Sequence, residues 1–393
     1  MSAEPDATLA DDEPPGIATQ LMSEQAAFGA VVPPIVQTSL FTFETVAEME
    51  AAFADPMRRP VYTRGRNPTA QAFEAKLAML EGAEEARGFA SGMAAISGTL
   101  LALLKTGDRL VAVRHLYPDA FRLMTGLMAR MGIETEFVDG GDLPALAAAA
   151  EGAALVYLES PTSMVFELHD LPKQIEIAHR AGAVVVVDNS WASPIHQRPL
   201  LLGADLVIHS ASKYLSGHSD TVAGAVAGRR DLIEEINTVT MPSLGAKLSP
   251  FDAWLLVRGL RTLPLRMARH HDTGLALARR LADHPKVATV HHPLLNRTDW
   301  GTLKGASGLF SFTVAGDAAM ARRVCDGLSL FRLGVSWGGH ESLAFPAALG
   351  RTQPGLTHPF EVFDVPTNLI RLHAGLEEPD DLWRDLDRAL TAA

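Results

Sequence analysis

The sequence predicts an α/β fold, in which a mostly parallel seven-stranded sheet carries helices on both faces and a smaller α+β domain follows it. From Thr69 onward, short apolar runs alternate with segments of helical spacing, which is typical of strands joined by crossover helices. Several of these runs are apolar on both faces, as strands in a sheet covered on each side must be. The chain has 393 residues, 47% of them hydrophobic, and is therefore long enough to bury such a core.

The N-terminal part of the chain is expected to contain little regular structure. Residues 1–16 are acidic and rich in proline, which predicts a disordered tail and not a secretion signal. Residues 17–60 are expected to form an irregular arm, because prolines at positions 33, 34, 56 and 60 interrupt any long periodic element. One helix is expected in this arm, over residues 47–53.

The main α/β domain is expected over residues 61–255. Its strands are predicted at residues 86–89, 110–113, 134–138, 154–158, 184–187, 206–208 and 222–226. Helical spacing between them covers residues 69–80, 92–104, 120–131 and 171–181. One broken helix or two abutting helices, at 250–261 and 264–281, lead into a second domain over residues 256–393. This domain is expected to have strands at 287–291, 309–314 and 369–372 and a helix at 379–391.

Composition limits the partners and the compartment. With 34 basic against 46 acidic residues, a net charge of -12 leaves no broad basic surface for nucleic acid or an anionic membrane. No apolar run reaches the roughly 18 residues that span a bilayer. The single cysteine, Cys325, excludes an intrachain disulfide and is typical of a reducing compartment, so a cytoplasmic location is expected. The histidine pairs at 270–271 and 291–292 lack further ligands at metal spacing, so no metal site is expected.

The segment over residues 210–220 is the most informative one for chemistry. Lys213 stands there among small hydroxyl residues, shortly after an apolar strand. Taken alone, such a lysine more often extends its amine to solvent. Burial at the end of a central strand would instead lower its pKa below the usual value of about 10.4, which suits Schiff-base formation and proton transfer.

Two other strand ends carry complementary groups. Asp188 follows four valines, and a buried carboxylate there needs a cationic partner, such as a protonated pyridine nitrogen. The turn Ser91-Gly92-Met93 opens a helix whose first amides can bind a dianion, and Ser210 and Ser212 could add hydroxyl donors. Alone, each of these features is more often a plain helix cap. An amine, a ring acid and a phosphate cradle together predict a site for pyridoxal 5′-phosphate (PLP).

Four segments resemble one known family. They are the run Tyr-Thr-Arg-Gly-Arg-Asn-Pro-Thr at residues 62–69, the turn at 91–93, Asp188-Asn189 and the lysine block at 210–220. In these segments, the chain resembles the Cys/Met metabolism family of fold-type I PLP-dependent enzymes, and the resemblance covers nearly the whole chain from about residue 17. It implies the fold-type I architecture, PLP as the cofactor and a small sulfur-containing amino acid as the substrate.

The resemblance also implies roles for single residues. Lys213 would hold the cofactor covalently, Asp188 would contact its ring nitrogen and Tyr117 would stack on its ring. Arg371 would bind the substrate carboxylate, because a planar guanidinium can donate two parallel hydrogen bonds to it. The phosphate would be held by Gly92, Met93, Ser210 and Ser212, and by Tyr62 and Arg64 from a neighbouring subunit. A homo-oligomer is therefore expected, at least a dimer and by this resemblance a tetramer.

Details near the site resemble bacterial cystathionine β-lyases within the family. Ser163 stands where many members carry asparagine, and Trp337 stands where γ-acting members usually carry leucine. Pro118-Asp119 replaces the Gly-Gly of many γ-acting members. The expected reaction is therefore β-elimination of cystathionine to homocysteine, pyruvate and ammonia. Lys213, Tyr117 and Tyr62 are the expected catalytic groups, and Arg371, Ser336 and Trp337 are expected to bind the substrate.

Two alternatives stay open. Residues 62–69 keep the general family form, from which β-lyases differ. A γ-acting enzyme is therefore the first alternative, either a methionine or cystathionine γ-lyase, a cystathionine γ-synthase or an O-acylhomoserine sulfhydrylase. The second is a PLP-binding scaffold that has lost catalysis.

Overall fold

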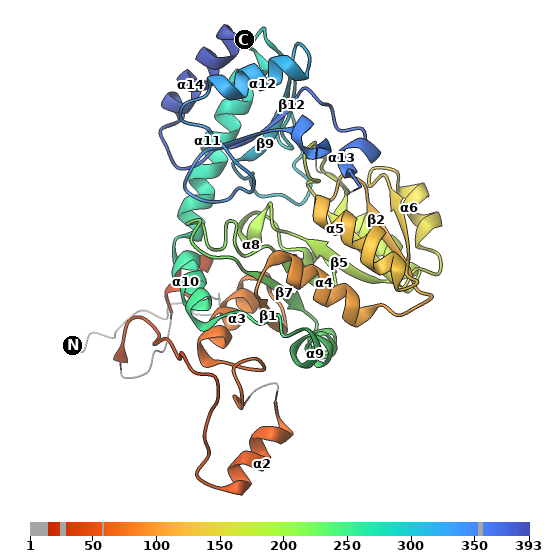
Figure 1. Ribbon diagram of the computed structural model, residues 1–393, viewed down its shortest axis with the longest axis vertical. Helices are drawn as coiled ribbons and strands as arrows, with labels where there is room; N and C mark the ends of the chain where they lie inside the picture. Colours follow the sequence, from red (N-terminus) through yellow and green to blue (C-terminus); the bar gives the residue numbers. More distant parts are fainter. Residues whose placement is uncertain (1–14, 24–28, 57–58, 353–356) are drawn as a thin grey trace, which may run out of the picture.

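The computed structural model describes residues 15–23, 29–56, 59–352 and 357–393. Nearly all of the tail expected at residues 1–16 therefore lies outside the described residues. Two sheets organise the rest, a large one in the middle of the molecule and a small one beside the C-terminus (Figure 1). No helix in the described part of the chain is long and apolar enough to cross a membrane.

The large sheet confirms the predicted fold class. Its seven strands run in the order β1-β7-β6-β5-β4-β2-β3. Neighbouring strands from β3 to β6 are parallel, whereas β7 is antiparallel to both β6 and β1. The strands are β1 (Glu85–Phe89), β2 (Arg109–Val113), β3 (Glu134–Val138), β4 (Leu155–Glu159), β5 (Val184–Asp188), β6 (Leu206–His209) and β7 (Gly224–Gly228).

Helices cover both faces of this sheet because alternate strand residues feed different cores. Leu155 and Tyr157 of β4 belong to a core shared with α4 (Gly92–Leu103), α5 (Pro118–Leu123) and α9 (Arg230–Val239). The residues between and after them on β4 pack with α6 (Leu143–Ala150) and α7 (Leu171–Arg180) on the other face. On that face, a further core joins α3 (Pro68–Glu81) and α10 (Pro250–Arg261) to β6 and β7.

The small sheet has the order β10-β11-β12-β9-β8, and only β10 and β11 pair in parallel. The long helix α11 (Leu263–Ala282) leads into it, and α12 (Ala318–Gly327) and α14 (Pro379–Ala392) share its apolar core (Figure 1). Its strands are β8 (Val287–His291), β9 (Leu309–Val314), β10 (Arg332–Leu333), β11 (Leu343–Pro346) and β12 (Leu369–His373). Short helical turns precede β12 at Ala347–Arg351 and α13 (Pro359–Val362).

Some elements differ from the sequence expectation. The helix expected over residues 120–131 begins already at Pro118 and passes after Leu123 into a π-helical turn, Met124–Met128. The sequence did not indicate α6, α9, α12, β10 or β11. The arm contains a short first helix, α1 (Ile17–Met22), and α2 (Val46–Ala54), which stands away from both sheets in Figure 1.

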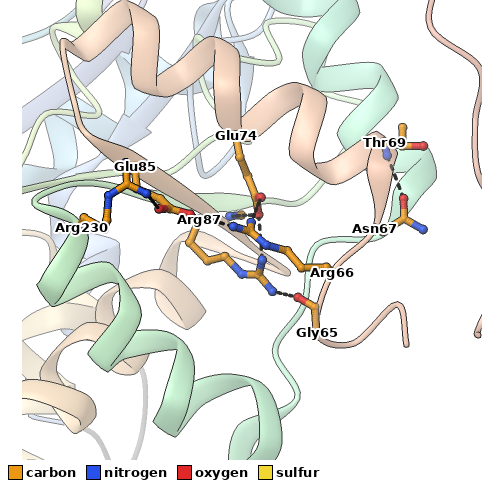
Figure 2. Close-up of polar contacts among 9 residues, drawn as sticks. Gly65, Arg66, Asn67, Thr69, Glu74, Glu85, Arg87 and Arg230 are labelled. Carbon is orange, nitrogen blue, oxygen red and sulfur yellow. Dashed lines mark hydrogen bonds and ion pairs between the residues drawn. The ribbon is translucent and has the colours of Figure 1, made fainter. Parts of the chain in front are cut away.

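A buried ion cluster joins the end of the arm to the large sheet (Figure 2). Arg66 donates to Glu74 of α3 at 2.5 Å and to Glu85 of β1 at 2.7 Å. Arg87 of β1 lies 3.6 Å from Glu74 and donates to the carbonyl of Gly65. Because buried charges are costly without partners, this cluster holds the end of the arm at one place on the domain.

Candidate active site

One part of the site is the turn between β1 and α4. Ser91 caps α4 by accepting the amide of Ala94 at 3.0 Å, which leaves the amides of Gly92 and Met93 at the open end of the helix. Gly92 lies against Ser210, since a side chain at Gly92 would place its first carbon 2.8 Å from the Ser210 Oγ. Backbone amides and a hydroxyl therefore meet at a helix N-terminus, an arrangement that suits a phosphate.

Lys213 follows β6 and faces a loop of the small domain. It donates to the Oγ of Ser336 at 2.5 Å, and its amine lies 5.3 Å from the ring centre of Trp337. Gly338 in the same loop has a φ of +88°, and a Cβ there would lie 2.9 Å from the Lys213 Cα. Only glycine accommodates both conditions, so the loop approaches the lysine as closely as the backbone permits.

Arg371 reaches the same loop from β12. Its Nη2 donates to the carbonyl of Ser336 at 3.2 Å. Burial and the Arg371 charge lower the pKa of Lys213 to about 8, although the Asp188 charge acts in the opposite direction. An amine with such a pKa is partly unprotonated near neutral pH, so it can act as a nucleophile and as a base.

Asp188 ends β5 and is buried. It accepts the amide of Ser190 at 2.9 Å and the hydroxyl of Tyr157 at 3.2 Å. Glu159 is its partner in the ladder between β4 and β5, and burial together with the Asp188 charge raises the pKa of Glu159 to about 8. Neither carboxylate forms an ion pair with any described residue. Because Glu159 is then mostly protonated near neutral pH, Asp188 is the buried carboxylate that lacks a cationic partner, and it calls for a cationic ligand.

Tyr117 joins this group from the start of α5. Its amide donates to Glu159 Oε2 at 2.8 Å, and its hydroxyl donates to Asp119 Oδ2 at 3.0 Å. The ring is about one third exposed, with 37% of the residue accessible. A planar ligand lying over Asp188 and Glu159 would thus meet an accessible aromatic ring.

Ser212 is turned away from the helix end. Its hydroxyl donates to the Ala223 carbonyl at 3.1 Å and accepts the Ala223 amide at 2.8 Å. Its expected phosphate contact would therefore use the remaining lone pair or require a change of rotamer.

Tyr62 and Arg64 stand apart from the other predicted residues of the same chain. The Arg64 guanidinium lies 5.3 Å from the centre of the Tyr62 ring, and 47% of Tyr62 is exposed. Both line a pocket of about 280 Å³ together with Lys247 and Pro250. Within the described residues, neither side chain contacts Lys213.

Two residues of the site had no role assigned from the sequence. Glu159 could have been found, because it ends a parallel strand next to the one that ends in Asp188. Tyr157 gave no such signal, since an aromatic residue inside an apolar strand is usually plain core. No group of three or more metal-ligating side chains occurs among the described residues.

The residues that the structure brings together fit PLP. Asp188, which lacks a cationic partner, suits a protonated ring, Lys213 suits an aldehyde, and the open end of α4 suits a phosphate. The fit rests on Lys213, Asp188, Tyr117, Gly92 and Ser210, which four different strand ends place around one region.

Comparisons with known proteins point in the same direction. The Cys/Met metabolism PLP-dependent enzyme family matches residues 17–391. The L-methionine gamma-lyase of Pseudomonas putida is 41% identical over 96% of this chain and 98% of its own. The cystathionine gamma-synthase of Mycobacterium tuberculosis (strain ATCC 25618 / H37Rv) is 37% identical over 93% of each chain. The crystal structure of cystathionine gamma synthase from Xanthomonas oryzae pv. oryzae in complex with aminoacrylate and cysteine has a TM-score of 0.88, at 36% identity, and covers 96% of this chain and 98% of its own.

Proposed function

The chain belongs to the Cys/Met metabolism family of PLP-dependent enzymes, and from this premise we propose that it is a carbon–sulfur lyase that acts at the γ-carbon. The relatives favour the γ-acting alternative over the β-lyase interpretation, because they are named methionine gamma-lyase and cystathionine gamma-synthase. The proposed net reaction converts methionine and water into methanethiol, ammonia and 2-oxobutyrate.

PLP, when bound, withdraws electrons from the substrate and so makes protons on its carbon atoms easier to remove. Lys213 would hold its aldehyde carbon, and Asp188 would face its ring nitrogen. The phosphate would be held by the amides of Gly92 and Met93 and by the hydroxyl of Ser210, and by Ser212 only after its hydroxyl leaves Ala223.

The observation that carries the proposal is the contact of 2.5 Å between Lys213 Nζ and Ser336 Oγ. It directs an amine with a pKa of about 8 toward the loop that Arg371 contacts. Arg371 would bind the substrate carboxylate, which places the adjacent α-carbon near the amine. Elimination at the γ-carbon requires removal of a proton from Cα and then from Cβ, and Lys213 Nζ is the base that we propose for both steps.

Trp337 would close one side of the substrate site. Its ring lies over the Lys213 amine and 5.4 Å from the ring of Tyr214, so it limits access of water to the amine. Tyr117 would supply the proton that the departing sulfur needs, because it carries a protonated hydroxyl on which the Asp188 charge acts.

We propose that the active assembly is a homo-oligomer, at least a dimer and by family resemblance a tetramer. Tyr62 and Arg64 are exposed, and within the described residues neither contacts Lys213. Both observations support the expectation that they complete the phosphate site of a second copy. A cytoplasmic location is part of the same proposal and rests on the single cysteine.

Steady-state assays with methionine, cystathionine, cysteine and O-acetylhomoserine test the proposal directly. We expect methionine alone to yield 2-oxobutyrate and methanethiol. Release of pyruvate and not 2-oxobutyrate from cystathionine would instead support the β-lyase interpretation. Turnover of O-acetylhomoserine only when a thiol is added would support a synthase. Absence of any keto acid with all four compounds, together with no thiol-dependent turnover of O-acetylhomoserine, would support the inactive scaffold.

A further inference from the structure

Asp119, two residues after Tyr117, contacts the tyrosine hydroxyl with its carboxylate. Tyr117 Oη donates to Asp119 Oδ2 at 3.0 Å, and Arg122 Nη1 donates to Asp119 Oδ1 at 2.7 Å. Pro118 occupies the first position of α5, which fixes the backbone between the two residues. The tyrosine is also held at its amide by Glu159, so both ends of the residue are anchored.

We propose that Asp119 is a positioning residue for Tyr117, which holds the phenol proton on the hydroxyl and fixes the direction of that hydroxyl in the site. The inference rests on the proposed function, in which Tyr117 assists departure of sulfur. It extends that function, because it names Asp119 as the group that keeps the Tyr117 hydroxyl protonated and oriented.

The proton transfer that Asp119 would control is simple to balance. Once Lys213 has removed a proton from the carbon next to the γ-carbon, the electron pair left there forms the new carbon–carbon double bond. The carbon–sulfur bond breaks and its electron pair goes to sulfur, which takes the proton from Tyr117 Oη. The thiol leaves, and the phenolate recovers a proton from water at the exposed side of Tyr117.

Charges from several elements act on the Tyr117 hydroxyl. Partial burial, the charge and hydrogen bond of Asp119, and the charge of Asp188 on β5 raise the pKa of Tyr117 well above its usual value of 10.0, whereas Arg122 lowers it. Arg371 on β12 and Tyr157 on β4 are also electrostatically coupled to it. Asp119 thus opposes the guanidinium groups, which on their own would favour the phenolate and remove the acid.

A purely structural role for Asp119 makes a different prediction. Asp119 and Arg122 form a partly exposed i,i+3 ion pair, which contributes only about 0.3 kcal/mol to stability. If this pair were its whole role, replacing the carboxylate would alter stability slightly and leave the ionisation of Tyr117 unchanged.

The test compares Asp119→Asn with the unchanged holoenzyme over pH 6 to 11. Because the pKa of Tyr117 lies well above 10.0 in the unchanged enzyme, we expect kcat with methionine to show no Tyr117 limb up to pH 11. In Asp119→Asn, loss of the charge and hydrogen bond of Asp119 should bring the start of an alkaline limb into the upper end of this range. Asp119→Glu should restore most of the original profile. Glu134→Gln, an exposed change on β3, is the matched control and should leave the profile unchanged.

A second readout is independent of activity. The chain has four tyrosines, so ultraviolet absorbance can follow phenol ionisation in the holoenzyme. Subtracting the titration of Asp119→Asn/Tyr117→Phe from that of Asp119→Asn isolates Tyr117. We expect Tyr117 of the unchanged enzyme to stay protonated up to pH 11, and Tyr117 of Asp119→Asn to begin to ionise within that range.

The two readouts separate failure of this inference from failure of the proposed function. If methionine is not cleaved but the Tyr117 titration moves, the positioning role holds and the lyase assignment fails. If methionine is cleaved but neither the alkaline limb nor the titration moves in Asp119→Asn, the positioning role is overturned. A shift of the alkaline limb that persists unchanged in the Tyr117→Phe background overturns it as well, because Asp119 would then act on another group.

Discussion

Opposing electrostatic effects act on the amine of Lys213. Burial and the Arg371 charge lower the pKa of its amine to about 8, and the Asp188 charge partly counteracts them. Ser336 accepts a hydrogen bond from the amine and offers its carbonyl to Arg371. A single loop residue thus connects the proposed base to the proposed carboxylate receptor, which explains why the expected substrate residues at 336 and 337 lie next to the lysine.

Arg371→Ala tests the carboxylate receptor. Losing a charge-assisted, two-bonded contact costs about 2 kcal/mol or more, so we expect KM for methionine to rise roughly 30-fold with a smaller change in kcat. Arg332→Ala, an exposed change on β10 of the same sheet, is the matched control. An unchanged KM in Arg371→Ala would remove Arg371 from the substrate site.

The chemical role of a residue could be predicted from the sequence only where a local sequence pattern identifies that residue. Lys213 and Asp188 follow apolar strands, and Arg371 lies in a motif of the family, so each could be named in advance. The hydrogen bond from Tyr157 to Asp188 could not, because it depends on how neighbouring strands place their side chains on one face. The Asp119 contact to Tyr117 likewise depends on the turn that Pro118 introduces.

At the scale of elements, the ion cluster of Figure 2 links α3, β1 and the arm. Glu74 accepts from Arg66 and also takes the amide of Gly88 at 3.0 Å, so it serves two elements at once. Burial lowers the pKa of Arg87, whereas the Glu74 charge raises it and so keeps this guanidinium charged in the interior. The cluster thereby determines where the segment bearing Tyr62 and Arg64 leaves the domain.

Glu74→Ala should destabilise the fold strongly. It leaves two buried guanidinium groups without their shared partner, which costs about 3–5 kcal/mol. Urea unfolding of the mutant at pH 7.5 measures this loss, and Glu134→Ala, at an exposed position, should change the free energy of unfolding by no more than about 0.5 kcal/mol. If both mutants unfold at the same urea concentration, the cluster does not stabilise the domain.

Elements with a strong internal pattern could be predicted, and short ones could not. The buried strands of the large sheet carry apolar runs that identify them locally. By contrast, β10 has two residues and β11 has four, and each is defined by its pairing, β11 with β12 and β10 with β11. The apolar residues of α12 pack into the core of the small sheet, so their partners exist only once that sheet has formed.

At the scale of the whole molecule, histidine rings of α11 pack against His373 of β12 and against His196. The rings of His270 and His373 lie 5.2 Å apart, and those of His196 and His271 lie 6.0 Å apart. Burial lowers the pKa of His196 and His270 to about 4 and that of His292 to about 3. These side chains are therefore neutral in the folded protein at pH 7.

This arrangement predicts loss of stability in mild acid. Below pH 6.5 the unfolded chain takes up protons on these histidines while the folded chain does not, so stability falls between about pH 6.5 and pH 4. At pH 5 the loss is about 2 kcal/mol for each such histidine. Urea unfolding of His292→Gln at fixed protein concentration should show a smaller decrease between pH 7.5 and pH 5 than the unchanged chain. His340→Gln, at an exposed position, should show the same decrease as the unchanged chain, and an equal decrease in both mutants would contradict the prediction.

The choice between β- and γ-elimination shows what local motifs miss. The β-lyase interpretation used a few positions, chiefly Ser163 and Trp337. Identity over nearly the entire chain favours γ-acting relatives instead. The effect of one side chain on the reaction at a shared active site depends on the loops around it. Two residues are therefore a weaker guide to the reaction than similarity over the entire chain.

The central claim is that Lys213 carries the cofactor, and reductive trapping tests it most directly. Borohydride would make the link between PLP and its lysine permanent, and peptide mass mapping of the digested holoenzyme would then locate the added mass. We predict the adduct on the peptide that contains Lys213, its loss in Lys213→Arg and its retention in the matched variant Lys105→Arg. An adduct on any other lysine, or none at all in a preparation that contains PLP, would contradict this account.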